Sequence, residues 1–139
     1  MLFRRRKHAF SRILIVEDEP LVAFDNEHFL RDEGYVVVAT VDTVADALAA
    51  IDSEQPQLVL TDIRLSDGGT GLDVARAARA KDIPVVFVTA TCPIDAQALA
   101  FGCLAKPYTP RDLRDAVEVV AAKLAGQEPQ RVPPGMSVF

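Results

Sequence analysis

Tryptophan is absent from this sequence of 139 residues, and cysteine occurs only twice, as Cys92 and Cys103. Two cysteines are too few for a disulfide scaffold, and they have neither the number nor the spacing of a zinc site. We therefore expect both of them to be free thiols in a reducing cytosol.

Long apolar runs are also missing. The basic start is followed by an apolar stretch, Ile13 to Val16, that is only as long as a strand before Glu17 ends it. A signal peptide needs a longer apolar core, and a membrane span needs about 20 apolar residues. The sequence thus predicts a cytoplasmic protein without membrane contact.

Basic residues are scarce outside the N-terminus. The first twelve residues hold five of the 15 Lys and Arg residues and no acid, so the remainder carries 20 acidic residues against ten basic ones. Binding of duplex nucleic acid depends on Lys and Arg side chains that neutralise phosphates. The excess of acidic residues after residue 12 argues against DNA as the main partner.

Hydrophobic residues make up 50% of the chain, which suffices for a core, and the length allows one domain of ordinary size. We expect a basic N-terminal extension at 1–11, a folded domain at 12–125 and a tail at 126–139. The tail is interrupted by Pro and Gly and is predicted to be mobile.

Short apolar segments alternate with helical patterns along the domain. Strands are predicted at 13–16, 35–39, within 57–65, at 85–88 and at 103–105, and helices at 20–33, 43–51, 70–80, 93–100 (a poor one) and 109–124. Thr43, Thr70 and Thr109 are expected to cap three of these helices. This order predicts an α/β fold in which a five-stranded parallel sheet has helices on both faces.

The stretch 57–65 is the centre of the predicted site, because its apolar residues run directly into Asp62. A strand buried on both faces ends at the carboxyl edge of the sheet, where open α/β sheets bind their ligands. Charged or hydroxyl side chains also follow the other strands. A parallel sheet brings the following residues to one edge: Glu17, Asp18, Asp62, Thr89 and Lys106.

These residue types indicate phosphoryl chemistry. Three converging carboxylates repel one another unless a cation joins them, and hard oxygen ligands select Mg²⁺ or Mn²⁺. A cation, one lysine and one hydroxyl also match the charged oxygens of a phosphoryl group. A carboxylate that faces such a site can act as a nucleophile and form an acyl phosphate.

Four motifs, each at a strand end, resemble those of the receiver domains of two-component response regulators. They are Ile-Leu-Ile-Val-Glu-Asp-Glu-Pro (13–20), Leu-Val-Leu-Thr-Asp-Ile-Arg-Leu (58–65), Val-Val-Phe-Val-Thr-Ala (85–90) and Lys-Pro-Tyr-Thr (106–109). The similarity covers about 12–124. It implies the receiver fold with strand order 2-1-3-4-5.

The resemblance also implies how the acidic residues act. Asp62 would be the phosphoacceptor, taking a phosphoryl group from a phosphohistidine of a sensor histidine kinase or a histidine phosphotransfer protein. Asp18 and Asp62 would bind Mg²⁺ directly, together with the backbone carbonyl of Arg64. Glu17 would act through water.

The resemblance also implies roles for two further residues. Thr89 would donate a hydrogen bond to one phosphoryl oxygen and move towards it, and Lys106 would neutralise another. Such families often have a cis peptide bond before Pro107, which an X-Pro bond tolerates.

The sequence departs from the family at Cys103, where receivers usually carry Tyr or Phe as a rotamer switch. The interval from Thr89 to Lys106 is also short and leaves little room for a regular fourth helix. These departures resemble a subgroup of stand-alone receivers that lack the aromatic residue. We expect the segment 91–102 to become ordered or to move on phosphorylation.

The sequence therefore predicts a stand-alone receiver with a protein target, because 126–139 is too short for an effector domain. It would not be a conventional enzyme, although it would catalyse its own phosphorylation and dephosphorylation. One alternative is a docking module that never uses Asp62. Another is a phosphohydrolase like the haloacid-dehalogenase group, but that group places its nucleophile after the first strand, with a second Asp where this sequence has Arg64.

Overall fold

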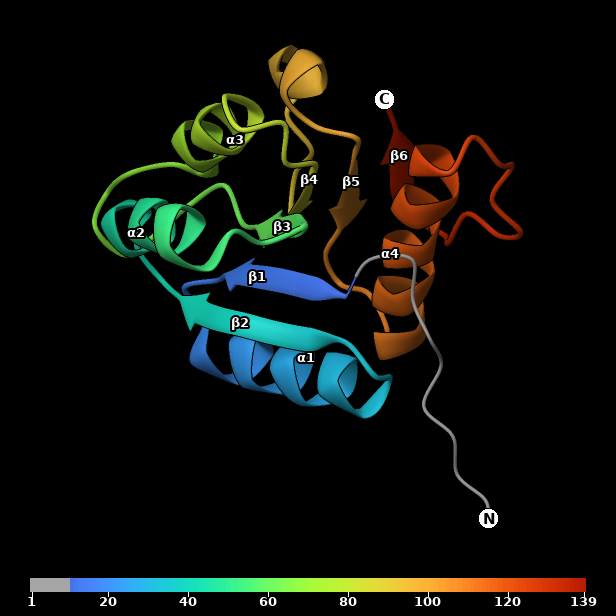
Figure 1. Cartoon of the computed structure of the whole chain (residues 1–139), viewed down its shortest axis with the longest axis horizontal. Coiled ribbons are helices and arrows are strands. Elements are labelled where there is room, and N and C mark those ends of the chain that lie inside the picture. The colour runs from blue at the N-terminus through green and yellow to red at the C-terminus, as the bar shows by residue number, and fades with distance from the viewer. Residues whose placement is uncertain (1–10) are drawn as a thin grey trace.

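A computed structural model describes residues 11–139 (Figure 1). The elements are β1 (Arg12–Val16), α1 (Pro20–Asp32), β2 (Val36–Val41), α2 (Val44–Glu54), β3 (Leu58–Thr61), α3 (Gly71–Arg79), β4 (Val85–Thr89), the 3-10 helix η1 (Ile94–Leu99), β5 (Gly102–Ala105), α4 (Pro110–Leu124) and β6 (Met136–Val138). The predicted extension 1–11 lies outside the described residues except for Ser11. Within 11–139, no helix combines the length and the apolar composition that a bilayer crossing requires.

The strands form one sheet in the order β2-β1-β3-β4-β5-β6. The first five pair in parallel, which confirms the predicted fold and strand order. Because the crossovers of parallel strands pass over the sheet, helices cover both faces. Helices α1 and α4 pack on one face, and α2 and α3 pack on the other (Figure 1).

Alternate residues of the central strands enter two different cores. In β1, Ile13 and Ile15 pack with α1 and α4, whereas Leu14 and Val16 pack with α2 and α3. Successive side chains of a strand point to opposite faces, so a strand covered on both sides must be apolar throughout. This requirement explains the uninterrupted apolar runs that lead to the carboxyl edge of the sheet.

Two of the three predicted helix caps are present. Asp46 N donates a hydrogen bond to Thr43 Oγ1 at 3.0 Å, at the start of α2. Thr109 and Asp112 form a capping box at the start of α4, with distances of 3.0 and 3.1 Å. The prediction for Thr70 was wrong, because its side chain makes no cap hydrogen bond at the start of α3.

The start of α3 is instead set by Gly71, which approaches the backbone that follows β3. Gly71 N donates to the carbonyl of Ile63 at 2.7 Å. A Cβ atom at Gly71 would lie 2.0 Å from the backbone oxygen of Asp62. The first turn of α3 can therefore pack this closely against the backbone of Asp62 only because residue 71 has no side chain.

Replacing Gly71 with alanine is therefore expected to lower the free energy of unfolding by about 1–3 kcal/mol, because backbone must shift to accept the methyl group. Urea unfolding of Gly71→Ala measures this loss. Thr70→Ala is the neighbouring control and should change stability by less than about 0.5 kcal/mol, as expected where no cap is removed. Equal losses in both variants would contradict the steric argument.

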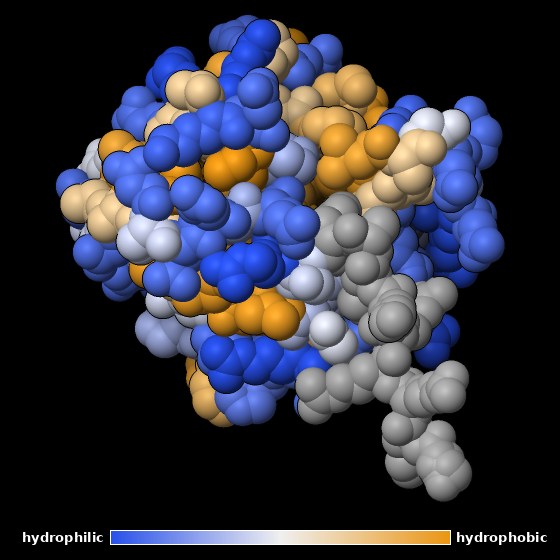
Figure 2. All heavy atoms as spheres, viewed as in Figure 1, coloured by the Kyte–Doolittle hydropathy of each residue, from blue (hydrophilic) through white to orange (hydrophobic). Residues whose placement is uncertain are grey.

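The prediction of a mobile tail was wrong for its last residues. Met136–Val138 form β6, which pairs antiparallel with β5, and Phe139 N donates to the carbonyl of Phe101 at 2.9 Å. A Cβ at Gly102 would lie 2.5 Å from the backbone oxygen of Ser137, so a glycine permits this close pairing. Apolar side chains gather over β5 and β6 in Figure 2. Strand β6 thus covers an edge that a five-stranded sheet would leave open.

Cys92 and Cys103 form a disulfide, so the prediction of two free thiols was wrong. Their Cα atoms lie 5.9 Å apart. A count of cysteines could not show this, because the pairing depends on the path of the chain between β4 and β5. That path turns back after β4 and places Cys92 against β5, and the segment predicted as a poor helix forms η1 within the enclosed loop.

Candidate functional site

The register of the parallel strands brings the predicted residues together at the carboxyl edge of the sheet. Val16 of β1 is paired with Thr61 of β3, so the residues that follow them, Glu17 and Asp62, emerge side by side. Thr89 of β4 is paired with Ala105 of β5, which places Lys106 directly beyond. Lys106 N donates to the carbonyl of Thr89 at 2.8 Å and fixes this junction.

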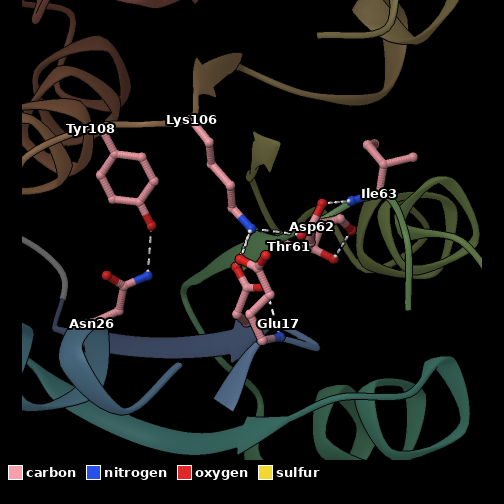
Figure 3. A network of polar contacts seen from close by, with 8 residues as sticks. Glu17, Asn26, Thr61, Asp62, Ile63, Lys106 and Tyr108 are labelled. Atoms are coloured by element: carbon pink, nitrogen blue, oxygen red, sulfur yellow. Dashed lines mark hydrogen bonds and ion pairs between the residues drawn. The ribbon is translucent and has the colours of Figure 1, made fainter. Parts of the chain in front are cut away.

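Asp62 is buried, with only 7% of its surface exposed, and both of its carboxylate oxygens accept hydrogen bonds. Ile63 N donates to Oδ1 at 2.6 Å, and Lys106 Nζ donates to Oδ2 at 2.8 Å. The backbone N–H of Asp62 donates to the carbonyl of Val16 at 2.9 Å. Neighbouring strands therefore hold the backbone, and the contacts at the carboxylate set its orientation (Figure 3).

Lys106 lies between three carboxylates. Its Nζ is 2.8 Å from Asp62 Oδ2, 2.9 Å from Glu17 Oε1 and 3.0 Å from Glu19 Oε2. Burial alone would lower the pKa of Lys106, but hydrogen bonds to Asp62, Glu17 and Glu19 raise it above its ordinary value. The lysine is thus held as a cation. The Lys106–Pro107 bond is cis, as the resemblance implies.

Glu17 is the most enclosed of the acidic residues, with 4% of its surface exposed. Burial raises its pKa to about 7, although the hydrogen bond from Lys106 acts in the opposite direction. Its Oε2 also accepts a hydrogen bond from Glu19 N at 3.1 Å. Figure 3 shows Lys106 reaching between Glu17 and Asp62, which come from two adjacent strands.

Glu17, Asp18 and Asp62 form an acidic cluster. Each offers a carboxylate oxygen, and these atoms lie within 4.8 Å of one another. Oxygen donors at this spacing, with negative charge in excess of what one lysine balances, suit a hard divalent cation such as Mg²⁺. The residues present therefore fit a metal ion.

Thr89 and Arg64 lie around this cluster. Thr89 is buried at the last position of β4, and its carbonyl accepts the backbone hydrogen bond from Lys106. Arg64 follows two residues after Asp62 and forms an isolated antiparallel bridge with Thr70. The bridge closes the loop between β3 and α3 beside the cluster.

Two contributors to the site were not predicted from the sequence. Glu19 pairs with Lys106, and only its place in the acidic run 17–19 hinted at this contact. Tyr108 Oη accepts a hydrogen bond from Asn26 Nδ2 at 2.8 Å, linking α1 to the segment that follows Lys106. Burial raises the pKa of Tyr108, so its hydroxyl stays protonated. Tyr108 belongs to the motif 106–109, but its partner on α1 becomes visible only in the fold.

The fold and the site define a doubly wound α/β domain with an acidic, lysine-containing centre at the carboxyl edge of its sheet. Residues 13–118 match the family model of the response regulator receiver domain. The chain belongs to this family, whose members act in two-component signalling.

Known relatives agree with this assignment. The chain is 33% identical over 124 residues to the chemotaxis protein CheY of Pseudomonas aeruginosa, covering 83% of this chain and 99% of that protein. It is 40% identical over 82 residues to the phyllosphere-induced regulator PhyR of Methylorubrum extorquens, covering 58% of this chain. The solved PhyR response regulator REC domain of Erythrobacter litoralis has 31% identity and a TM-score of 0.69, covering 88% of this chain and 97% of that one.

Some relatives are much longer than the region they share with this chain. The matched region is 31% of the PhyR sequence and 57% of the transcriptional regulatory protein PdtaR of Mycobacterium tuberculosis. Those proteins therefore contain further parts with no counterpart in the alignment.

Proposed function

We propose that Asp62 is a phosphoacceptor that takes its phosphoryl group from a phosphohistidine of a sensor histidine kinase or a histidine phosphotransfer protein. The observation that carries this proposal is the 2.8 Å contact of Asp62 with Lys106 beside the acidic cluster. The phosphorylated domain would then relay the group, lose it to water or bind a protein target.

The contacts of Asp62 support a nucleophilic role. One carboxylate oxygen attacks phosphorus, the bond from phosphorus to the histidine nitrogen breaks, and the imidazole leaves, so that an acyl phosphate forms on Asp62. The N–H of Ile63 orients the carboxylate, and the Lys106 cation lies where it can turn to a phosphoryl oxygen. The same groups would support phosphorylation by small donors and hydrolysis of the acyl phosphate.

A divalent cation, Mg²⁺ or Mn²⁺, is part of this proposal. Asp18 and Asp62 would hold it directly together with the backbone carbonyl of Arg64, and Glu17 would act through water. The outer role suits Glu17 because its carboxylate is already paired with Lys106 at 2.9 Å. The bound ion would supply positive charge that offsets the carboxylates and the phosphoryl oxygens.

Thr89 is proposed as the residue that responds to the phosphoryl group. Its hydroxyl would donate a hydrogen bond to one phosphoryl oxygen while Lys106 neutralises another. Its position at the end of β4 supports this role, because the backbone contact with Lys106 keeps both residues at one edge of the site.

A protein target is supported by charge and by relatives. The region beyond the first twelve residues is acidic, which disfavours contact with nucleic acid phosphates. A solved structure from Bartonella quintana, 29% identical and covering 75% of this chain and 45% of that one, is called the anti-anti-sigma factor PhyR, a name that refers to protein partners. A kinase or phosphotransfer protein on the input side and a protein on the output side fit this pattern.

Phosphorylation by a small donor tests the proposal. The protein is incubated with phosphoramidate and Mg²⁺, and its intact mass is measured. We expect a gain of one phosphoryl group, and no gain when the metal is removed with a chelator. A protein that gains no phosphoryl group under either condition, and none from a panel of phosphorylated histidine kinases, would be a docking module instead.

Mg²⁺ is expected to raise the melting temperature of the protein, because relief of the crowded carboxylates favours the folded state. A ligand that binds only the folded state adds about 2.7 kcal/mol to stability at a hundredfold excess over its Kd. Thermal unfolding with and without Mg²⁺ measures the effect. The rise should be much smaller in Asp18→Ala, and unchanged in Asp32→Ala, which alters an exposed carboxylate at the end of α1. An equal rise in Asp18→Ala would remove Asp18 from the metal site.

A further inference from the structure

The disulfide joins the segment that follows Thr89 to the segment that precedes Lys106, and both of these residues belong to the proposed site. Cys92 lies three residues after Thr89, and Cys103 lies three residues before Lys106. Between the two cysteines the chain forms η1, which lies near α3 in Figure 1, and then enters β5. The bond therefore closes a loop whose two ends lead directly into the proposed phosphoryl site.

The two sulfur-bearing residues differ in exposure. Cys103 is fully buried in β5, on the face that packs with α2 and α3. Cys92 is only half-buried and packs on the same core from outside. A thiol in solution can therefore approach the bond from the side of Cys92.

Other contacts hold mainly the end of the enclosed segment, where Leu99, Ala100 and Phe101 are partly buried against the two cores. In η1 only Ala96 is buried, and Ile94 is 84% exposed. The Arg79 guanidinium donates a hydrogen bond to the carbonyl of Ala98, and Phe101 N donates to the carbonyl of Val85 at 2.8 Å. A short helix with one buried side chain has low local stability of its own. The covalent bond thus adds a restraint at the start of the segment, where the other contacts are sparse.

We propose that Cys92 and Cys103 form a dithiol–disulfide site that controls how freely the segment 91–102 moves. The part of this proposal that links the segment to Thr89 rests on the proposed function. In the oxidised form the segment is tied to β5, and Thr89 is restrained through Ala90 and Thr91, the two residues that join it to Cys92. In the reduced form the segment is released and can follow Thr89 towards a phosphoryl group.

The reductant is a dithiol. One of its sulfurs, as thiolate, attacks Cys92 Sγ; a new S–S bond forms, and the bond to Cys103 breaks. The Cys103 thiolate takes up a proton. The second thiol of the reductant then displaces Cys92, which is protonated in turn. Two electrons and two protons pass from the dithiol to the protein, and the reductant leaves as a disulfide.

Hydrogen exchange in both redox states tests the redox site. The protein is treated with dithiothreitol under native conditions, the reductant is removed, and the protein is unfolded and alkylated, because Cys103 is buried in the folded state. Alkylation should add no label without dithiothreitol treatment and two labels after it. Exchange of the amides in 91–102 should become faster on reduction, on the order of tenfold or more, because a loop constraint is lost. Exchange in α1 should not change. Equal exchange in both states, or a disulfide that dithiothreitol leaves intact in the folded protein, would overturn the proposal.

Cys92→Ser is the matched variant, since it removes the bond without altering the buried side of the pair. Its segment should exchange like that of the reduced wild-type protein, and dithiothreitol should have no effect on it. If Cys92→Ser exchanged like the oxidised protein, the disulfide would not be the restraint.

Beryllofluoride with Mg²⁺, a mimic of the phosphoryl group, separates this proposal from the proposed function. We expect it to increase protection of 91–102 in the reduced protein and in Cys92→Ser, but not in the oxidised protein. A redox effect without any response to beryllofluoride would overturn the proposed function and the link to Thr89, while the redox site would stand. A response that is the same in both redox states would overturn the control by the disulfide.

Discussion

Asp62→Asn is expected to abolish phosphorylation by phosphoramidate, to the limit of detection by intact mass. An amide has nearly the shape of the carboxylate but lacks the negative charge that makes its oxygen a nucleophile. Its oxygen can still accept the hydrogen bond from Ile63 N, which is 2.6 Å long in the native protein. The variant should therefore fold and fail only in the chemistry.

Asp32→Asn provides the matched control, because it makes the same chemical change at an exposed carboxylate at the end of α1. We expect it to gain one phosphoryl group at the rate of the native protein. A phosphoryl group on Asp62→Asn would show that another residue is the acceptor.

Lys106→Met is expected to produce the largest loss of stability among substitutions at the site. It removes the cation that contacts Asp62, Glu17 and Glu19, and the lysine side chain is only 17% exposed. Without this cation, Asp62 and Glu17 must either face each other as buried charges or take up a proton, and both alternatives cost stability. We expect the free energy of unfolding to fall by about 2–3 kcal/mol at neutral pH without Mg²⁺.

Urea unfolding measures this loss, and added Mg²⁺ should recover part of it by supplying another cation. Lys81→Met is the control, because Lys81 pairs with Asp52 where both side chains are well exposed. Exposed pairs contribute about 0–1 kcal/mol, so this variant should change little. If both variants lost the same stability, the buried contacts of Lys106 would not be the cause. Phosphorylation should also slow in Lys106→Met and not in Lys81→Met.

The sheet and the gathering of the site residues could be predicted because the signals for them are local. Each apolar run, such as 58–60, is followed by a polar residue, and parallel pairing brings the ends of such runs to one edge. Helix caps such as Thr43 and Thr109 are likewise recognised from a pattern of four consecutive residues. The strand register then places Glu17 beside Asp62, and Lys106 directly beyond the pair of Thr89 and Ala105.

The disulfide and β6 could not be predicted, because each depends on which distant segment lies alongside. Counting cysteines treats Cys92 and Cys103 as independent, although the turn after β4 brings them together. Pro and Gly in 126–135 indicate a loose tail, but they do not reveal that the residues after 135 pair with the edge strand β5. The contact between Glu19 and Lys106 was missed for the same reason, since 87 residues separate the two in the chain.

Trapping of the acyl phosphate with borohydride tests the central claim most directly. Borohydride reduces an aspartyl phosphate to homoserine, and sequencing of the peptides by mass spectrometry then locates the modified residue. After incubation with phosphoramidate and Mg²⁺, we predict homoserine at position 62 and unmodified aspartate at position 18. Homoserine at another position, or a phosphorylated protein that yields none, would contradict the assignment of Asp62 as the phosphoacceptor.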